Sequence, residues 1–294
     1  MHIFPEGVMV IREQIIAILL ALLCPFTIIP QNITGSTSAA GSNTSGKTGI
    51  FSWNYLLGKE DAALLTEHHI TEVYQYVRSS YTDEEVADYL ELMKEAGIEV
   101  YILDGEPEWC DKSHRDEMRM VLDKMDHYNA LVPEDAGFKG AVFDVEPYLL
   151  SDWKSEGDQM IRWLRKNVEA LKEERDVDIS VCIPYFYDTH GYSEQLEKLI
   201  RACDGIMVMN YYRDQEIPHI ETEVQYAATY GTRLVNLYEL KAHGDSAGED
   251  KISYHYEGLD KTYESIARIR QAYPDQHIDM GYHDIKYFKE LVNN

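Results

Sequence analysis

The residues Gly137-Phe138-Lys139-Gly140-Ala141-Val142-Phe143-Asp144-Val145-Glu146-Pro147-Tyr148 carry the strongest structural signal in the chain. The apolar run before Asp144 predicts a strand that is buried on both faces, and two carboxylates and a proline follow it directly. Because side chains alternate along a strand, Asp144 and Glu146 are expected on the same face at its carboxyl end. A carboxylate pair can supply one group that stays ionised and one that donates a proton. The alternative is a strand that simply ends in two solvated acids beside Pro147.

Similar apolar segments recur along the rest of the chain, and amphipathic helical patterns separate them. Strands are predicted at Gly49–Tyr55, Glu72–Val77, Glu99–Leu103, Gly140–Val145, Ile179–Pro184, Gly205–Asn210, Arg233–Tyr238 and His277–Tyr282. Helices are predicted at Thr82–Ala96, Arg115–Asn129, Gln159–Glu174, Ser193–Ala202, Ile220–Tyr230 and Lys261–Tyr273. Eight strand-helix units within residues 49–294 predict a single (β/α)8 TIM barrel, a fold that typically takes ~250 residues. An open doubly wound sheet is the alternative, but no glycine-rich phosphate loop follows any of these strands.

The helix predicted at Thr82–Ala96 has the clearest boundaries. Thr82 and Glu85 form a capping-box pattern at its start, and Gly97 is a typical residue for its end. The predicted apolar face consists of Val86, Tyr89, Leu90 and Met93.

The N-terminal region has a different composition from the barrel. Ile15–Ile29 is uncharged and follows Arg12, which predicts that residues 1–30 are a signal peptide or a membrane anchor. A buried core helix is the alternative. Residues 31–48 are rich in Gly, Ser, Thr and Asn and predict a linker. We therefore expect an exported protein, extracellular or held at the cell surface, with membrane contact only if the first segment stays uncleaved.

Charge and cysteine content narrow the possible partners. The 27 basic and 52 acidic residues give a net charge of −25, which disfavours nucleic acid and favours a neutral ligand such as an oligo- or polysaccharide. Apart from Cys24 in the N-terminal segment, the cysteines are Cys110, Cys182 and Cys203. Their odd number and the lack of CxxC spacing indicate no disulfide framework and no zinc site. We expect a monomer without cofactor or metal.

Aromatic and polar residues follow most of the predicted strands. In a barrel the carboxyl ends of the strands form the rim that holds the active site. Tyr and Trp stack on sugar rings, and polar side chains reach sugar hydroxyls. The predicted substrate-binding residues are Trp53, Asn54, Asp104, Glu106, Trp109, Tyr185, Tyr187, Asn210, Arg213 and His283. About half of the rim aromatics are instead expected to pack between the barrel and the helices, and Tyr148 and Phe186 are examples.

Two of these segments resemble a known family. Residues 139–146 resemble the fourth-strand Asp-x-x-Asp-x-Asp-x-Glu pattern of glycoside hydrolase family 18, the chitinase-like barrels. Asp144 and Glu146 match its last two acids, whereas Lys139 and Val142 stand at the two earlier Asp positions. Asp204–Tyr212 resembles the sixth-strand pattern that ends Met-x-Tyr-Asp, with Tyr211 on the tyrosine and Tyr212 in place of the Asp.

The resemblance implies candidate catalytic roles. Glu146 would donate the proton, while Asp144 and Tyr211 would hold the substrate's N-acetyl group as it attacks the anomeric carbon. The chain also resembles glycosidases with catalytic Glu residues on strands four and seven, which would add Glu239 as a nucleophile. The chain is therefore expected to be a glycoside hydrolase that cleaves O-glycosidic bonds.

Two other functions remain open from the sequence. The degraded motif is compatible with a barrel of the cell surface that binds carbohydrate without cleaving it. Metal-dependent hydrolysis is a weaker alternative, with His68-His69, His283-Asp284 and Glu106 as imaginable ligands.

Overall fold

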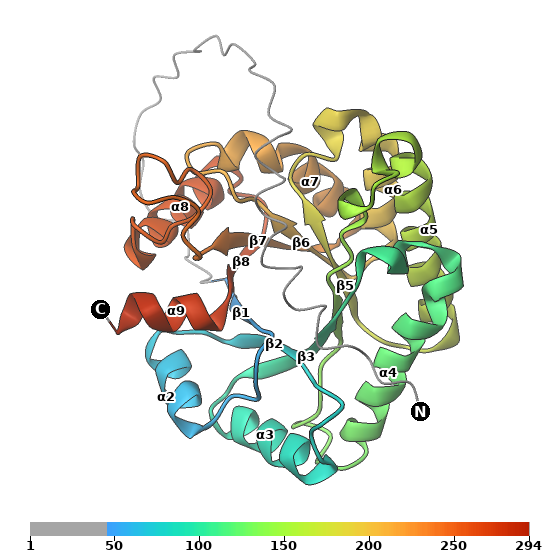
Figure 1. Cartoon of the computed structure of the whole chain (residues 1–294), viewed down its shortest axis with the longest axis vertical. Coiled ribbons are helices and arrows are strands. Elements are labelled where there is room, and N and C mark those ends of the chain that lie inside the picture. The colour runs from blue at the N-terminus through green and yellow to red at the C-terminus, as the bar shows by residue number, and fades with distance from the viewer. Residues whose placement is uncertain (1–45, 294) are drawn as a thin grey trace. The chain divides into compact units, whose positions relative to one another are not determined.

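Eight parallel strands, paired in chain order, form a closed barrel in the computed structural model, which describes residues 46–293. The strands are β1 (Thr48–Ser52), β2 (Glu72–Tyr76), β3 (Glu99–Asp104), β4 (Ala141–Phe143), β5 (Ile179–Pro184), β6 (Gly205–Met209), β7 (Arg233–Glu239) and β8 (Ile278–His283). The pairing of β1 with β8, at Ile50 and Tyr282, closes the barrel and rules out the open doubly wound sheet. The predicted (β/α)8 fold is confirmed (Figure 1). The predicted signal or anchor segment and most of the predicted linker lie outside the described residues.

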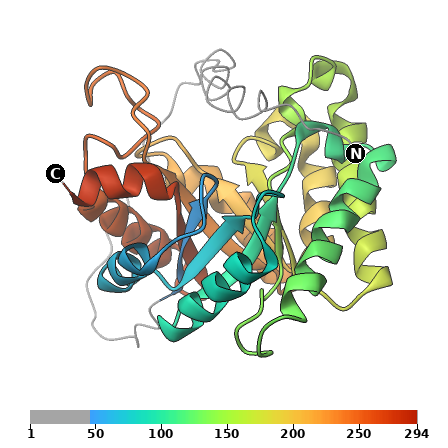
Figure 2. The same cartoon turned by 60° about the horizontal axis from the view of Figure 1, so that its bottom comes forward.

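The helices form a ring outside the strands, as Figures 1 and 2 both show. They are α2 (Lys59–Glu67), α3 (Asp83–Glu95), α4 (Arg115–Asn129), α5 (Trp153–Glu174), α6 (Ser193–Ala202), α7 (Glu216–Tyr230), α8 (Leu259–Ala272) and α9 (Ile285–Val292). Strands β5 and β6 are buried along their whole length, because one side of each faces the barrel interior and the other faces the helices. None of the helices in residues 46–293 is both long and apolar enough to cross a membrane.

Helix α3 forms for the reasons that its sequence indicates. Thr82 Oγ1 accepts the Glu85 N–H at 3.2 Å, and Glu85 Oε2 accepts the Thr82 N–H at 2.8 Å, so the capping box is complete. The buried residues of α3 are the four that the pattern predicts. Gly97 follows the helix with φ of 73°, a conformation that glycine adopts without strain.

Other helix boundaries differ from the prediction. Helix α7 begins at Glu216 rather than Ile220, because Pro218 lies in the first turn, where a backbone N–H is not needed. Helix α5 begins at Trp153 and runs through Gly157, which gives room for Tyr192: a Cβ at Gly157 would lie 2.6 Å from the Tyr192 hydroxyl. The short helices α2 and α9 were not predicted.

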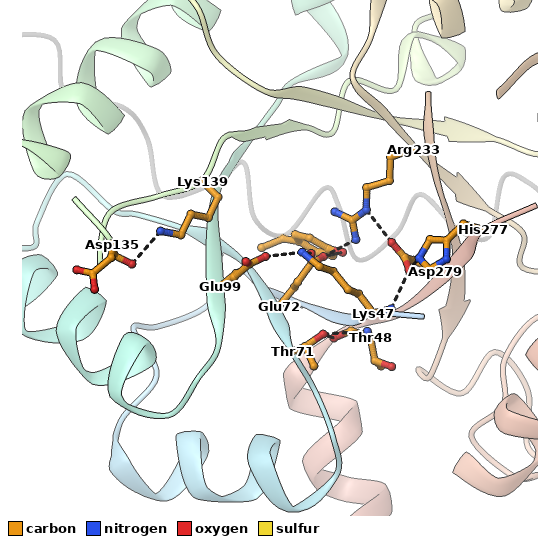
Figure 3. A network of polar contacts seen from close by, with 11 residues as sticks. Lys47, Thr48, Thr71, Glu72, Glu99, Asp135, Lys139, Arg233, His277 and Asp279 are labelled. Atoms are coloured by element: carbon orange, nitrogen blue, oxygen red, sulfur yellow. Dashed lines mark hydrogen bonds and ion pairs between the residues drawn. The ribbon is translucent and has the colours of Figure 1, made fainter. Parts of the chain in front are cut away.

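A network of charged side chains closes the barrel at the N-terminal ends of its strands (Figure 3). Glu72, which has no exposed surface, pairs with Arg233 at 2.6 Å and with Lys47 at 3.0 Å. Arg233 also pairs with Asp279 at 2.7 Å. The Tyr74 hydroxyl donates to Glu72 Oε2 at 2.9 Å. This network is structural, because it lies at the end of the barrel opposite the carboxyl ends of the strands.

Candidate active site

The two acids of the fourth strand lie at the open end of the barrel. Asp144 and Glu146 are both partly exposed, while Val145 between them is buried, as strand alternation predicts. The Asp144 N–H donates to the Asp104 carbonyl at 2.9 Å, so the pairing of β4 with β3 continues up to the first acid. Gly105 makes this approach possible, because a Cβ there would lie 2.3 Å from the Asp144 carbonyl oxygen.

Glu146 is held by a tyrosine two residues further along the chain. The Tyr148 hydroxyl donates to Glu146 Oε1 at 2.9 Å, from the short turn η4 (Pro147–Leu149). The Tyr148 ring packs edge-on against Phe186 at 5.4 Å between ring centroids. We expected Tyr148 only to pack; its ring does so, but its hydroxyl belongs to the site.

Tyr211 follows β6 and lies among the acids of the site. Burial raises the pKa of its hydroxyl well above the usual value, and the charges of Glu239, Asp144 and Glu146 raise it further. The hydroxyl therefore stays protonated and can donate a hydrogen bond. The four predicted catalytic residues lie at the end of β7 or just after the ends of β4 and β6, and the charges of the three acids all act on Tyr211.

Glu239, the last residue of β7, is completely buried and forms an ion pair. Its Oε1 accepts the backbone N–H groups of Leu240 and Lys241, both at 2.8 Å, and its Oε2 lies 3.2 Å from His283 Nδ1. Burial alone would raise the pKa of Glu239, but the charge of His283 and these hydrogen bonds outweigh burial and lower it to about 2. Both oxygens are therefore occupied, which leaves Glu239 poorly placed to attack a substrate.

His283, the last residue of β8, carries the opposite charge. Burial would lower its pKa, but the charge of Glu239 and their hydrogen bond raise it to about 9, so that the ring is an imidazolium at neutral pH. The ring lies roughly parallel to that of Tyr211, with 6.3 Å between ring centroids, and remains 24% exposed. The charge of Asp144 also favours the protonated ring. The site therefore contains a fixed cation beside its acids.

A second histidine near Glu239 could not be found from the sequence. His243 lies in the long loop between β7 and α8, and its Nε2 is 3.9 Å from Glu239 Oε2, an ion-pair rather than a hydrogen-bond distance. The backbone N–H of His243 donates to the buried Asp250 carboxylate at 2.7 Å, which fixes this part of the loop. No periodic pattern or motif marks a histidine in such a loop.

Several predicted substrate-binding residues lie partly exposed on the rim. They are Trp53, Asn54, Asp104, Glu106, Trp109 and Tyr185. Trp53 packs against Tyr76, with 5.9 Å between ring centroids, and Trp109 lies 6.5 Å from Phe143. Tyr185 stacks on His219 at 4.2 Å, so one face of its ring is already covered.

Three other predicted substrate contacts have structural roles. Tyr187 is 1% exposed and stacks on Trp153 at 5.6 Å. The Asn210 amide is also buried and donates to Asn236 Oδ1 and to the Glu216 carbonyl, both at 2.9 Å. The Arg213 guanidinium donates to carbonyl oxygens of the β7–α8 loop, at Ala247, Asp250 and Ser253. The sequence correctly placed these three residues after the strands, but it could not show whether their side chains are exposed on the rim or packed beneath it.

The histidines considered as metal ligands do not come together. His68 ends α2 and packs edge-on against Phe288 at 5.4 Å, just before the N-terminal end of β2. It therefore lies at the opposite end of the barrel from Glu106 and His283. Within residues 46–293, no group of three or more His, Cys, Asp or Glu side chains is arranged to hold a metal ion.

Comparisons with known proteins show what the barrel is similar to. No family model and no curated protein matches the sequence. A chitinase from Bacteroides thetaiotaomicron is 12% identical over 82% of this chain and 90% of its own, with a TM-score of 0.56. A GH18 chitinase from Pseudoalteromonas aurantia is 14% identical over 84% and 99%, with a TM-score of 0.52.

A putative alpha-L-fucosidase from Bacteroides thetaiotaomicron VPI-5482 has the same TM-score, 0.52, at 12% identity over 88% of this chain and 91% of its own. At such low identity these similarities show the fold alone. The shared fold is the closed eight-stranded (β/α)8 barrel.

Proposed function

We propose that this protein is a glycoside hydrolase that cleaves O-glycosidic bonds with Glu146 as general acid. The observation that carries the proposal is the convergence of Asp144, Glu146 and the Tyr211 hydroxyl at the open end of the barrel. General acid catalysis needs a positioned carboxyl group beside the leaving oxygen, and a second acid can stabilise the positive charge that develops on the sugar ring. The similarity to chitinase and fucosidase structures supports the same reaction class.

The remaining residues suggest how the charge on the sugar would be stabilised. Asp144 would face the developing cation, and the Tyr211 hydroxyl would donate to an acyl or hydroxyl group of the substrate. We propose that Glu239 acts through His283 rather than as the nucleophile, because it has no exposed surface and both of its oxygens are already bound. The imidazolium of His283 would then place a positive charge near Asp144.

The alternative is a barrel that binds carbohydrate without cleaving it. One observation favours this alternative: Val142, fully buried in β4, and Lys139 stand where the resembled motif has two further acids. Under either function we propose a surface or extracellular location for the protein. That proposal rests on the composition of residues 1–48 alone.

Hydrolysis assays with Glu146→Gln separate the two functions. Soluble oligosaccharides and polysaccharides, chitin oligomers and fucosylated glycans first, are incubated with each protein, and released reducing ends are measured. The matched control is Glu197→Gln, since Glu197 on α6 also accepts a tyrosine hydroxyl, from Tyr230 at the end of α7. We expect hydrolysis by the unmodified protein and the control, and none by Glu146→Gln. Binding without hydrolysis by the unmodified protein would establish the alternative.

A further inference from the structure

Tyr148 contacts Glu146, the residue that is proposed to act as general acid. We propose that Tyr148 is a positioning residue for Glu146: by donating to Oε1, it fixes the carboxyl group and favours Oε2 as the oxygen that carries the proton. The inference rests on the proposed function, because positioning matters only if Glu146 delivers a proton. Tyr148 itself need not touch the substrate.

The surroundings of Tyr148 hold its hydroxyl in one place. The 2.9 Å bond to Glu146 is accompanied by a contact of 3.9 Å to the Met209 sulfur, and the ring lies edge-on to both Phe186 and Trp153. A ring fixed on several sides loses little further freedom when it forms a hydrogen bond. The carboxyl group of Glu146 is therefore oriented by a rigid partner.

Tyr148 remains a hydrogen-bond donor over the whole useful pH range. Burial raises the pKa of its hydroxyl well above the usual value, and the charges of Glu146 and Asp144 raise it further. Tyr187 and Tyr211 also interact electrostatically with Glu146, and burial raises the pKa of each well above the usual value.

The hydrogen bond has a measurable effect on the acid. A donor to a carboxylate stabilises the ionised form, so its removal makes the carboxyl group hold its proton to higher pH. We expect Tyr148→Phe to move the titration midpoint of Glu146 upward by about one pH unit. A residue with only a packing role would not move this midpoint, because phenylalanine keeps the ring.

Carbon-13 NMR of glutamate-labelled protein measures the midpoint without any substrate. The Glu146 carboxyl signal is assigned by its absence in Glu146→Gln. The matched control is Tyr230→Phe: Tyr230, the last residue of α7, donates the same kind of bond to Glu197 on α6. It should leave the Glu146 midpoint unchanged. An unchanged midpoint in Tyr148→Phe overturns the inference.

Kinetics with 4-nitrophenyl N,N′-diacetylchitobioside supply the second measurement. In Tyr148→Phe the alkaline limb of kcat should move up by about one pH unit, and the plateau should fall about tenfold with KM unchanged. In a Glu146→Gln background, the residual release of 4-nitrophenolate, a leaving group that needs little protonation, should not change further when Tyr148→Phe is added. An additive loss in that background overturns the inference while the proposed function stands. If neither this glycoside nor any sugar of the panel is hydrolysed by the unmodified protein, the proposed function fails, and the inference fails with it.

Discussion

Replacing Glu239 with glutamine removes the negative charge of the ion pair beneath the site and keeps the shape of the side chain. Glutamine can still accept the N–H groups of Leu240 and Lys241, which Glu239 Oε1 accepts at 2.8 Å. The bond of 3.2 Å to the His283 imidazolium, however, loses its ionic character. We therefore expect a loss of stability that depends on pH.

The magnitude follows from the two pKa values. Despite burial, the charge of His283 lowers the pKa of Glu239 from 4.5 to about 2, a difference of 4.5 − 2 = 2.5. At 1.36 kcal/mol per pKa unit, the ionised form is favoured by about 3 kcal/mol. The rise of the His283 pKa from 6.5 to about 9 describes the same interaction from the other side, so the two contributions are not added.

The pH window follows from the directions of the two shifts. The pKa of Glu239 is lowered, so its contribution is present above pH 4.5 and is lost as the pH falls through about 2. The pKa of His283 is raised, so its contribution is present below pH 6.5 and is lost as the pH rises through about 9. The ion pair stabilises the fold fully between 4.5 and 6.5.

Urea unfolding followed by circular dichroism measures this difference. At about pH 5.5, Glu239→Gln should lower the free energy of unfolding by about 3 kcal/mol, and the loss should shrink at about pH 9.5. The control Glu264→Gln removes a surface pair with Lys261 and should change little at any pH. A loss that is the same at both pH values, or larger at pH 9.5, would refute the reasoning.

Three further changes test other parts of the structure. Arg233→Met removes one ion-pair partner of the buried Glu72, so it should lower the free energy of unfolding in urea by about 3 kcal/mol. Adding Glu72→Gln should restore part of this free energy, because the buried charge is then removed as well. Gly105→Ala places a Cβ against the Asp144 backbone, so it should lower the free energy of unfolding by about 2 kcal/mol and reduce hydrolysis as well. An unchanged Tm would contradict the close approach of the two backbones. Tyr211→Phe should lower kcat about a hundredfold without changing the circular dichroism spectrum; an unchanged kcat would remove its hydroxyl from the mechanism.

The sequence was most informative where burial imposes a regular pattern. Strands such as β5, predicted and observed at Ile179–Pro184, are apolar on both faces and stand out between helical segments. The same pattern placed Asp144 and Glu146 at the end of β4, because strand alternation and barrel geometry together determine where their side chains lie.

Contacts that depend on tertiary packing could not be predicted from the sequence. The role of Tyr148 depends on a hydroxyl position that is set by Phe186, which follows β5, and by Met209, the last residue of β6. His243 lies near Glu239 in a loop between β7 and α8, in which Arg213 donates to Ser253 and Asp250 accepts the His243 backbone N–H. Nothing in the local sequence distinguishes these residues from ordinary packing or loop residues.

The proposed role of Glu146 as proton donor can be tested by comparing two substrates that differ in their leaving group. Once a cleaved sugar is known, its 2,4-dinitrophenyl glycoside, which leaves without protonation, is compared with its alkyl glycoside, which needs a proton. We predict that Glu146→Gln abolishes measurable hydrolysis of the alkyl glycoside and spares most of the hydrolysis of the dinitrophenyl glycoside. Equal losses on both substrates, or no loss on either, would contradict the assignment of Glu146 as the general acid.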